Sequence, residues 1–147
     1  MAKLKEYIAS KDLDTYVRLV RAKEFIDRHY MKPICLSEIS KNSFFSTYHF
    51  IRLFKKAFHT TPHQYLIKRR IEKAKQLASG HDLSITTICY SIGFASPGSF
   101  SLLFKKYTGY SPLEYKLKAI AKQKEAVKNP QILIPGCFVY MYITDKK

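Results

Sequence analysis

The stretch STYHFIRLFKKAF, residues 46–58, decides how the rest of this chain is arranged. Ser46 is a residue type that caps helix N-termini, and apolar side chains then recur at spacings of three and four: Phe50, Leu53, Phe54 and Phe58. This spacing predicts an amphipathic helix with one buried face. The opposite face carries a tyrosine and three cations but no acid: Tyr48, Arg52, Lys55 and Lys56. A short helix that is apolar on one side and basic on the other fits the major groove of DNA.

The same pattern returns fifty residues later. Two phenylalanines and two lysines recur in the same order: Phe100, Phe104, Lys105 and Lys106 correspond to Phe50, Phe54, Lys55 and Lys56. Just before these helices the offset is 49: Leu36, Ile39 and Phe45 correspond to Ile85, Ile88 and Phe94. The second turn is therefore one residue longer, at a loop position that tolerates an insertion. The chain is predicted to hold two copies of one unit.

The chain carries a strong positive charge, and its placement follows the two helices. Lys+Arg 26 against Asp+Glu 11 gives a net charge of +15, which indicates a polyanionic partner. The total charge alone leaves DNA, RNA, an anionic membrane surface and an acidic protein open. No acid occurs between Glu38 and Glu72 or between Asp82 and Glu114, the two windows that contain the basic helices. The positive charge is therefore concentrated on these two segments, whereas an ordinary solvent-exposed surface would mix basic and acidic residues.

Length and cysteine usage bound the class of protein. The 147 residues fit one domain, or two small ones that share a core. Cys35, Cys89 and Cys137 are single and widely spaced, which is typical of a reducing compartment. The N-terminal sequence lacks the apolar core of a signal peptide, and no apolar run approaches membrane-spanning length. We expect a cytoplasmic protein.

An all-α fold of about seven helices is predicted. The expected helices span residues 15–30, 36–42, 46–58, 62–79, 85–91, 97–107 and 112 to near 123. In each half a short helix, a tight turn and a second helix follow one another, which is a helix-turn-helix arrangement. We call the second helix, which is expected to enter the major groove, the reading helix. Capping signals support these boundaries. Ser84 and Ser96, which is followed by Pro97, are expected N-caps. Thr61 with Gln64 and Ser111 with Glu114 have the spacing of capping boxes, and Gly80 and Gly109 are expected to end their helices.

The helix expected over residues 62–79 is the rod that joins the two halves. Its apolar residues are expected to face the core: Tyr65, Leu66, Ala74, Leu77 and Ala78. Its basic residues are expected to stay outside: Lys68, Arg69, Arg70, Lys73 and Lys75. The resulting division has an N-terminal extension (1–14), a first helix-turn-helix subdomain (15–61), the linker helix (62–80), a second subdomain (81–122) and a basic stretch with an extended or hairpin-like tail (123–147).

Over about residues 20–122 the chain resembles the DNA-binding domain of the AraC/XylS family. The most diagnostic part is ICYSIGF at 88–94 and FSLLFKKYTGYSPLEY at 100–115, while RLFKKAF at 52–58 and TPHQY at 61–65 are a looser match. Departures are Cys89, where alanine is usual, and Phe44, where the first turn often has glycine. The resemblance implies two helix-turn-helix motifs that bind adjacent major-groove segments on one face of DNA.

The resemblance also implies which side chains of the first reading helix contact DNA. Tyr48, Ile51 and Arg52 match base-facing positions, and Arg52 is expected to contact guanine through both ends of its guanidinium. The alternative for Arg52 is a contact with phosphate only. Thr47 and His49 are expected at a phosphate or a base edge, against simple exposure to solvent.

The second reading helix is expected to discriminate less between bases. Its base-facing residues are Gly98, Ser99 and Leu102, whereas family members commonly have glutamine and arginine at the positions of Gly98 and Leu102. Leu102 is expected to press on a thymine methyl group. The residues of both helices expected at the DNA backbone are Ser46, Thr47, His49, Lys55, Lys56, Ser96, Ser101, Lys105 and Lys106. The alternative role of the four lysines is solubility.

The sequence gives little support for base stacking, metal binding or catalysis. The helical spacing of the phenylalanines favours core packing over base stacking. His59 and His63 lie four apart, but Pro62 starts a new helix between them and no cysteine pair accompanies them, so no metal site is expected. No catalytic triad, carboxylate pair or phosphate-binding loop stands out, so we expect neither an enzyme nor a cofactor.

The expected function is sequence-specific binding of duplex DNA by a transcription regulator. The expected partners are double-stranded DNA, bound as a monomer, and RNA polymerase. Residues 1–14 leave no room for a preceding ligand-sensing domain, so the chain is either a small stand-alone regulator or a piece of a longer protein. The alternative is an interaction module in which the aromatic tail, residues 132–143, docks a partner or pairs two chains. Peripheral membrane binding is disfavoured because the basic face is split between two motifs.

Overall fold

The computed structural model describes residues 13–41, 43–80 and 82–128, and these form helices without any strand. The helices are α2 (Leu13–His29), α3 (Leu36–Lys41), α4 (Thr47–Phe58), α5 (Pro62–Gly80), α6 (Ile85–Ser91), α7 (Pro97–Thr108) and α8 (Pro112–Lys128). The predicted all-α class is confirmed for this part of the chain. The expected extended tail, residues 129–147, lies outside the described residues.

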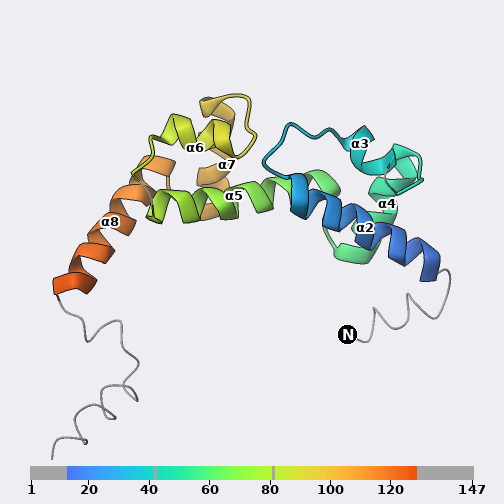
Figure 1. Cartoon of the computed structure of the whole chain (residues 1–147), viewed down its shortest axis with the longest axis horizontal. Coiled ribbons are helices and arrows are strands. Elements are labelled where there is room, and N and C mark those ends of the chain that lie inside the picture. The colour runs from blue at the N-terminus through green and yellow to red at the C-terminus, as the bar shows by residue number, and fades with distance from the viewer. Residues whose placement is uncertain (1–12, 42, 81, 129–147) are drawn as a thin grey trace, which may run out of the picture.

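The helices form two lobes that are joined by α5 (Figure 1). The first lobe contains α2, α3 and α4, and the second contains α6, α7 and α8. Each lobe has its own core, and α5 contributes to both. Leu66 is buried in the first core, whereas the next residue, Ile67, is buried in the second. The predicted linker helix therefore also supplies a wall of each core.

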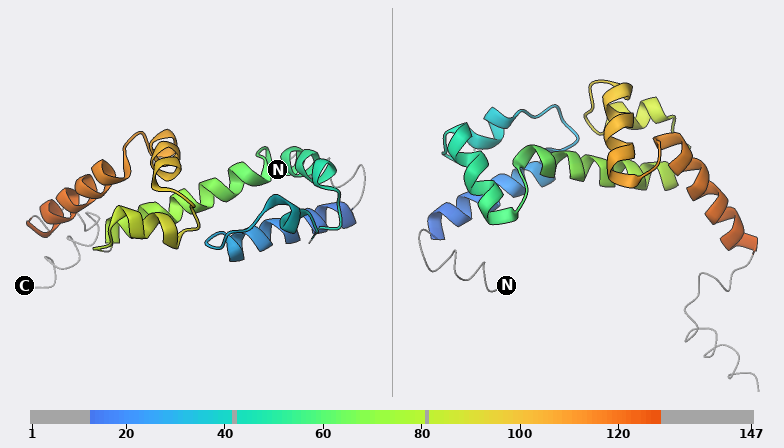
Figure 2. Two further views of the ribbon diagram at one scale, coloured as in Figure 1. Left: turned by 90° about the horizontal axis from the view of Figure 1, so that it is seen from above. Right: turned by 180° about the vertical axis from the view of Figure 1, so that it is seen from behind.

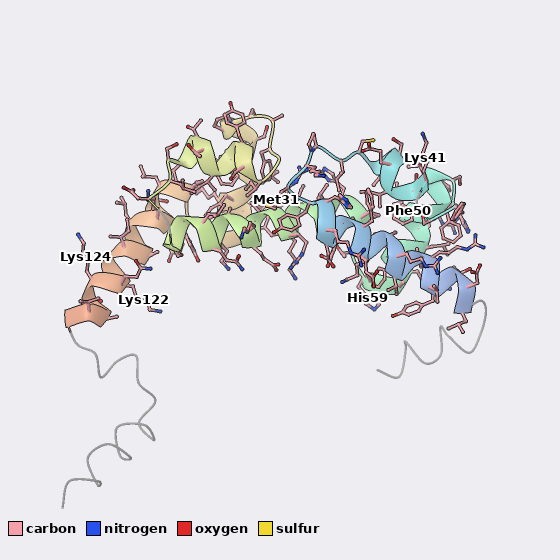
Figure 3. The ribbon with its side chains drawn as sticks, viewed as in Figure 1. Met31, Lys41, Phe50, His59, Lys122 and Lys124 are labelled. Atoms are coloured by element: carbon pink, nitrogen blue, oxygen red, sulfur yellow. The ribbon has the colours of Figure 1, made fainter. Side chains whose placement is uncertain are left out.

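The same ladder of aromatic rings fills the two cores. Each ladder takes two phenylalanines from a reading helix and a tyrosine from the following helix: Phe50, Phe54 and Tyr65, then Phe100, Phe104 and Tyr115. In both ladders the phenylalanine centroids lie 5.5 Å apart with an interplanar angle of 64°. The four phenylalanines are almost completely buried, and Figure 3 shows Phe50 inside the first lobe. The predicted core packing is confirmed.

Capping hydrogen bonds begin α5 and α8 in the same way. The backbone N–H of Thr61 donates to the Gln64 side chain (3.1 Å), and the N–H of Gln64 donates to the Thr61 hydroxyl (3.2 Å). Ser111 and Glu114 form the equivalent pair at 2.8 and 3.3 Å. The hydrogen bond from the Ser111 N–H lowers the pKa of Glu114. The two predicted capping boxes are confirmed.

Ser46 does not cap α4 with its side chain, contrary to the expectation. It occupies the N-cap position with extended backbone, but its hydroxyl accepts no capping hydrogen bond. Residues 46–49 are all exposed, so water can satisfy the first N–H groups of α4. The hydroxyls of Ser84 and Ser96 do cap α6 and α7, because they accept from Thr87 N–H (3.0 Å) and Ser99 N–H (3.3 Å).

The end of α8 and the last residue of α5 also differ from the expectation. The sequence pattern predicts an end of the last helix near residue 123, but α8 continues to Lys128. The added turn is rich in lysine, glutamate and alanine, which are strong helix formers. Gly80 is the last residue of α5 but is not left-handed, whereas Gly109 ends α7 with φ 81°.

Left-handed backbone occurs at equivalent positions of the two halves. Phe44 (φ 56°) and Gly93 (φ 85°) occupy the turns before the reading helices, and His59 (φ 57°) and Gly109 (φ 81°) end these helices. The first half thus uses non-glycine residues where the second half uses glycine. The turn imposes this conformation on Phe44, whose side chain is 80% exposed and so lies outside the core.

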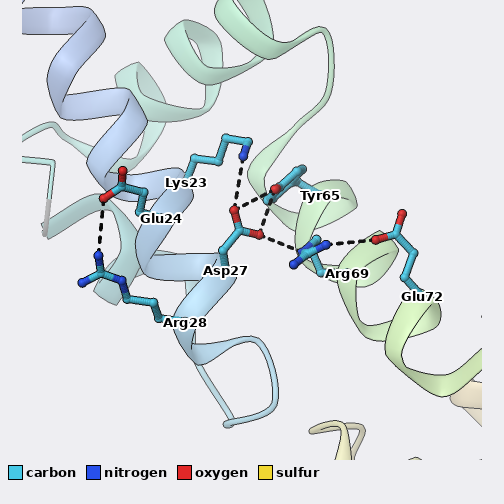
Figure 4. Close-up of polar contacts among 7 residues, drawn as sticks. All are labelled: Lys23, Glu24, Asp27, Arg28, Tyr65, Arg69 and Glu72. Atoms are coloured by element: carbon cyan, nitrogen blue, oxygen red, sulfur yellow. Dashed lines mark hydrogen bonds and ion pairs between the residues drawn. The ribbon is translucent and has the colours of Figure 1, made fainter. Parts of the chain in front are cut away.

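A polar network holds α2 against α5 (Figure 4). The Asp27 carboxylate accepts from the Tyr65 hydroxyl at 2.9 and 3.0 Å and pairs with Lys23 Nζ at 3.2 Å. Arg69 Nε lies 2.7 Å from Asp27 Oδ1, and Arg69 Nη1 lies 3.1 Å from Glu72 Oε2. Burial, together with the Asp27 charge, raises the pKa of Tyr65. The network fixes the first lobe on the N-terminal part of α5.

The expectation that Arg70 stays outside is wrong. Its residue exposure is 9%, and its guanidinium donates to two backbone carbonyls of the first lobe. The side chains of Lys68, Arg69 and Arg70 follow one another around the helix, so one of three neighbouring cations turns inward. Ile67 and Ile71, which flank this turn, are also buried and are not among the residues predicted for the core.

Candidate nucleic-acid interface

The first reading helix, α4, presents an arginine and a tyrosine together to solvent. Tyr48 is 72% exposed and Arg52 is exposed, one turn further along the helix. The Arg52 guanidinium carbon lies 5.8 Å from the centre of the Tyr48 ring, within the range of a cation–π contact. Ile51 is half-buried beside them. The ring restricts the arginine to one side of the helix without taking up its N–H donors.

The other predicted contact residues of α4 surround this pair. Ser46, Thr47, His49, Lys55 and Lys56 are all exposed. The Thr47 hydroxyl lies 3.1 Å from that of Ser40, which ties the start of α4 to α3. The His49 ring packs edge-on against Phe45 with centroids 5.6 Å apart. Helix α4 contains three cations and no acid.

The second reading helix, α7, presents small and apolar groups instead. Leu102 is 76% exposed, and Gly98 and Ser99 are exposed beside the start of the helix. The Ser96 hydroxyl is engaged, since it accepts from Ser99 N–H and donates to Ser99 Oγ (3.0 Å). Ser96 and Ser101 are half-buried, whereas Lys105 and Lys106 at the C-terminal end are exposed. The exposed surface of α7 therefore offers fewer polar groups to a base edge than that of α4.

The two reading helices lie on the same side of α5. The view from behind in Figure 2 shows α4 and α7 on the side that faces the viewer, one in each lobe, and Figure 1 shows both helices on the far side. Neither helix contains an acidic residue. The exposed residues that the sequence singled out are thus divided between two surfaces that a single extended polyanion can contact.

The described residues also bear on metal binding, membrane crossing and cysteine reactivity. This part of the chain has no group of three or more histidine, cysteine or acidic side chains placed to hold a metal ion. No helix within the described ranges is long and apolar enough to cross a membrane. Cys35 is exposed and Cys89 is buried, and burial raises the pKa of the Cys89 thiol.

Sequence reasoning missed the two residues that connect the lobes, Arg70 and Gly93. Arg70 stands in a run of basic residues, and the pattern around Gly93 indicates only a turn. A signal was present in the turns, because glycine occurs in the second and Phe44 in the first. That difference does not reveal the contact, because glycine also suits a left-handed turn that has no close neighbour.

Comparison with known proteins gives a consistent result. Residues 39–118 match a family described as helix-turn-helix domain. The chain is 33% identical over 100 residues to the probable transcriptional regulator LumQ of Photobacterium leiognathi, covering 68% of this chain and 40% of that protein. It is 30% identical over 111 residues to the uncharacterized HTH-type transcriptional regulator YdeC of Bacillus subtilis, covering 76% and 38%. The chain spans about two fifths of the length of these curated relatives.

Solved structures share the fold. The C-terminal domain of AraT, a response regulator from Geobacillus stearothermophilus, is 27% identical with a TM-score of 0.66, covering 69% of this chain and 84% of that one. The DNA-binding domain of AdpA, a global transcriptional factor solved in complex with a target DNA, has a TM-score of 0.65, covering 77% of this chain and 96% of that one. At 23% identity, the second likeness concerns the fold alone.

Proposed function

Because this chain belongs to the AraC-type helix-turn-helix family, we propose that it is a transcription regulator that binds duplex DNA in a sequence-specific manner. Helices α4 and α7 enter successive major grooves, about 34 Å apart along one face of the duplex. The observation that carries the proposal is the pair of exposed, acid-free helices on one side of α5. A net charge of +15 favours the polyanion.

Helix α4 is the main reader of bases in this proposal. Arg52 contacts guanine through two N–H donors, which is worth about 1–3 kcal/mol of discrimination. Tyr48 and Ile51 contact neighbouring base edges from the same face. The support is the exposure of Tyr48 and Arg52 and their 5.8 Å contact, which limits the positions of the guanidinium before DNA arrives.

Helix α7 reads its groove less strictly. Leu102 contacts a thymine methyl group, and Ser99, next to Gly98, offers a hydroxyl to a base or a phosphate. The support is the exposure of these three residues and the absence of a long polar side chain among them. The two halves of the binding site should therefore differ in information content, with the half under α4 more sharply defined.

The remaining predicted contacts neutralise and position the DNA backbone. We assign this role to Ser46, Thr47, His49, Lys55, Lys56, Ser96, Ser101, Lys105 and Lys106. If 6–10 phosphates are contacted, affinity should fall about 10³–10⁵-fold between 50 and 200 mM salt. The division into subdomains 15–61 and 81–122 around the linker 62–80 is supported by the two separate cores.

Partners and location follow from this role. We propose the cytoplasm, since LumQ and YdeC are bacterial proteins and bacterial chromosomes lie there, and we propose no catalytic activity. RNA polymerase as a second partner and self-association through residues 130–147 remain predictions. Deleting residues 130–147 tests the tail: unchanged DNA affinity with altered self-association would make it accessory.

The function is tested by selecting binding sites from random duplexes and measuring affinities by fluorescence anisotropy. Arg52→Ala should lose about 1–3 kcal/mol of discrimination at one base pair, normally guanine. Lys124→Ala is the matched control, because it removes one exposed charge on the outer part of α8 (Figure 3). Selection without a consensus, or equal losses for both variants on every sequence, would contradict the proposal.

A further inference from the structure

A second connection, besides the helical rod of α5, joins the two lobes. Arg70 projects from the middle of α5 toward the loop that follows α2. Its Nε donates to Tyr30 O at 2.7 Å, and its Nη2 donates to Lys32 O at 2.8 Å. Tyr30 directly follows the last residue of α2, where unpaired carbonyls carry partial negative charge, so a cation is favoured there.

The same guanidinium also contacts the second lobe. Its carbon lies 5.6 Å from the centre of the Phe94 ring. Phe94 in turn packs against Phe100 of α7, with centroids 5.3 Å apart. One side chain therefore links the end of α2 in the first lobe to the turn that leads into α7.

Gly93 brings the two backbones together at this point. A Cβ atom on Gly93 would lie 2.9 Å from Met31 O and 2.9 Å from Arg70 Nη2. Met31 belongs to the loop after α2 and lies between the lobes in Figure 3. The equivalent residue of the first turn, Phe44, is 80% exposed with similar backbone geometry. The demand for glycine at 93 therefore includes a close approach between the lobes, and is not set by the turn alone.

We infer that Arg70 and Gly93 form a clamp that sets the distance and angle between α4 and α7, and thereby the spacing of the two half-sites that the protein accepts on DNA. Arg70 is a positioning residue, because it acts on the reading helices through the loop after α2 and through Phe94. The inference rests on the proposed function for its consequence on DNA, while the clamp itself is a property of the free protein.

Without the clamp, α5 would supply most of the connection between the described parts of the two lobes. A single helix resists stretching but allows small bends and rotations of the lobes around it. Because successive base pairs are about 3.4 Å apart and rotate the groove by a tenth of a turn, such motion changes which half-site spacing fits. Loss of the clamp should therefore widen the range of spacings that bind, rather than abolish contact with either half-site.

The first experiment measures the lobes in the free protein. Spin labels at Lys41 on α3 and Lys124 on α8, both exposed, are introduced as cysteines in a background with Cys35→Ser, Cys89→Ala and Cys137→Ser. Arg70→Met should broaden the distance distribution between the labels. Lys68→Met is the matched control, because Lys68 is an exposed cation of α5 two residues before Arg70, whereas Arg69 itself helps to hold α2 on α5. An unchanged distribution in Arg70→Met would overturn the inference.

The second experiment measures spacing on DNA. Duplexes carry the selected site with one base pair added or removed between the half-sites. The wild type and Lys68→Met should prefer the selected spacing by about tenfold or more. Arg70→Met should reduce this preference to less than about threefold while keeping its affinity for a single α4 half-site. Full spacing preference in Arg70→Met would refute the clamp.

Two controls separate the possible failures. Arg70→Lys keeps the charge but can donate to only one of the two carbonyls with good geometry, so it should give an intermediate spacing preference. It replaces Arg70→Met as the test if circular dichroism shows that Arg70→Met is unfolded. If the wild type binds no sequence selectively, the proposed function fails. The label distances then still decide whether the clamp exists.

Discussion

Replacing Gly93 with alanine should destabilise the protein by about 3 kcal/mol, within a range of about 1–5 kcal/mol. Gly93 has a φ of 85°, and left-handed backbone costs a non-glycine residue about 1–2 kcal/mol. The new Cβ would lie 2.9 Å from Met31 O and from Arg70 Nη2, and relief of such overpacking typically costs about 1–3 kcal/mol. The smaller entropy of the unfolded alanine chain offsets about 0.4–1 kcal/mol of this.

The equivalent position in the first half provides a control inside the same chain. Phe44→Ala keeps a non-glycine residue at φ 56°, so the backbone strain does not change. The Phe44 side chain is 80% exposed, and its main described neighbour is the Arg18 guanidinium, 5.9 Å from the ring centre. Loss of this exposed cation–π contact costs about 0.5–1 kcal/mol. We expect Phe44→Ala to destabilise the protein by no more than about 1 kcal/mol.

Thermal and urea unfolding, followed by far-ultraviolet circular dichroism, measure both variants. Each kcal/mol should shift the Tm by roughly 2–8 °C for domains of this size, so Gly93→Ala should melt clearly below Phe44→Ala. A Gly93→Ala variant that melts with the wild type would show that the turn has room for a Cβ. A loss in Gly93→Ala of no more than about 1–2 kcal/mol, the cost of left-handed backbone alone, would mean that the turn geometry, and not the contact between lobes, demands glycine.

Three further predictions concern a cap, a reading residue and the thiols. The Ser111 N–H lowers the pKa of Glu114 in the folded state. The ionised Glu114 carboxylate therefore stabilises the fold above its unfolded pKa, and this stabilisation is lost as the pH falls through the folded pKa. Glu114→Gln should have a lower Tm than the wild type at pH 7, and the difference should shrink in melts taken from pH 5 to 3. A difference that grows with acidity would contradict the assigned cap. Leu102→Arg should sharpen the consensus under α7 in a site selection, by about 1–3 kcal/mol at one base pair; an unchanged consensus would mean that residue 102 does not face a base. Cys35, which is exposed, should react quickly with a thiol reagent, whereas Cys89 should react only as the protein unfolds, because it is fully buried and its thiol pKa is raised; mass spectrometry of the labelled peptides distinguishes the two.

Much of the fold could be predicted because its signals are local. The capping boxes of Thr61 with Gln64 and Ser111 with Glu114 join residues three apart, and the aromatic ladder repeats at helical spacing. The exposed faces of α4 and α7 follow from the same periodicity, because whatever is not on the apolar face points away from the core. Which residues of these faces contact DNA is what the resemblance to the AraC/XylS family implies, and their contact with DNA remains a proposal.

Residue type alone did not predict every local detail. Ser46 and Ser96 begin the two reading helices, yet only the Ser96 hydroxyl accepts a capping hydrogen bond. Phe44 adopts left-handed backbone although its type disfavours it, since the surrounding turn imposes that conformation. In both cases the outcome depends on how the neighbouring helices hold the chain.

By itself the sequence determined the duplication, the helices with most of their ends, and the two basic faces, because periodicity and capping act over three or four residues. The tertiary structure alone decided where these faces lie relative to each other. Arg70 looks from the sequence like one more exposed cation in a basic run, but its hydrogen-bond partners lie 38 and 40 residues away along the chain. Its burial depends on packing the end of α2 against the turn before α7, and no local pattern encodes a contact between segments so far apart.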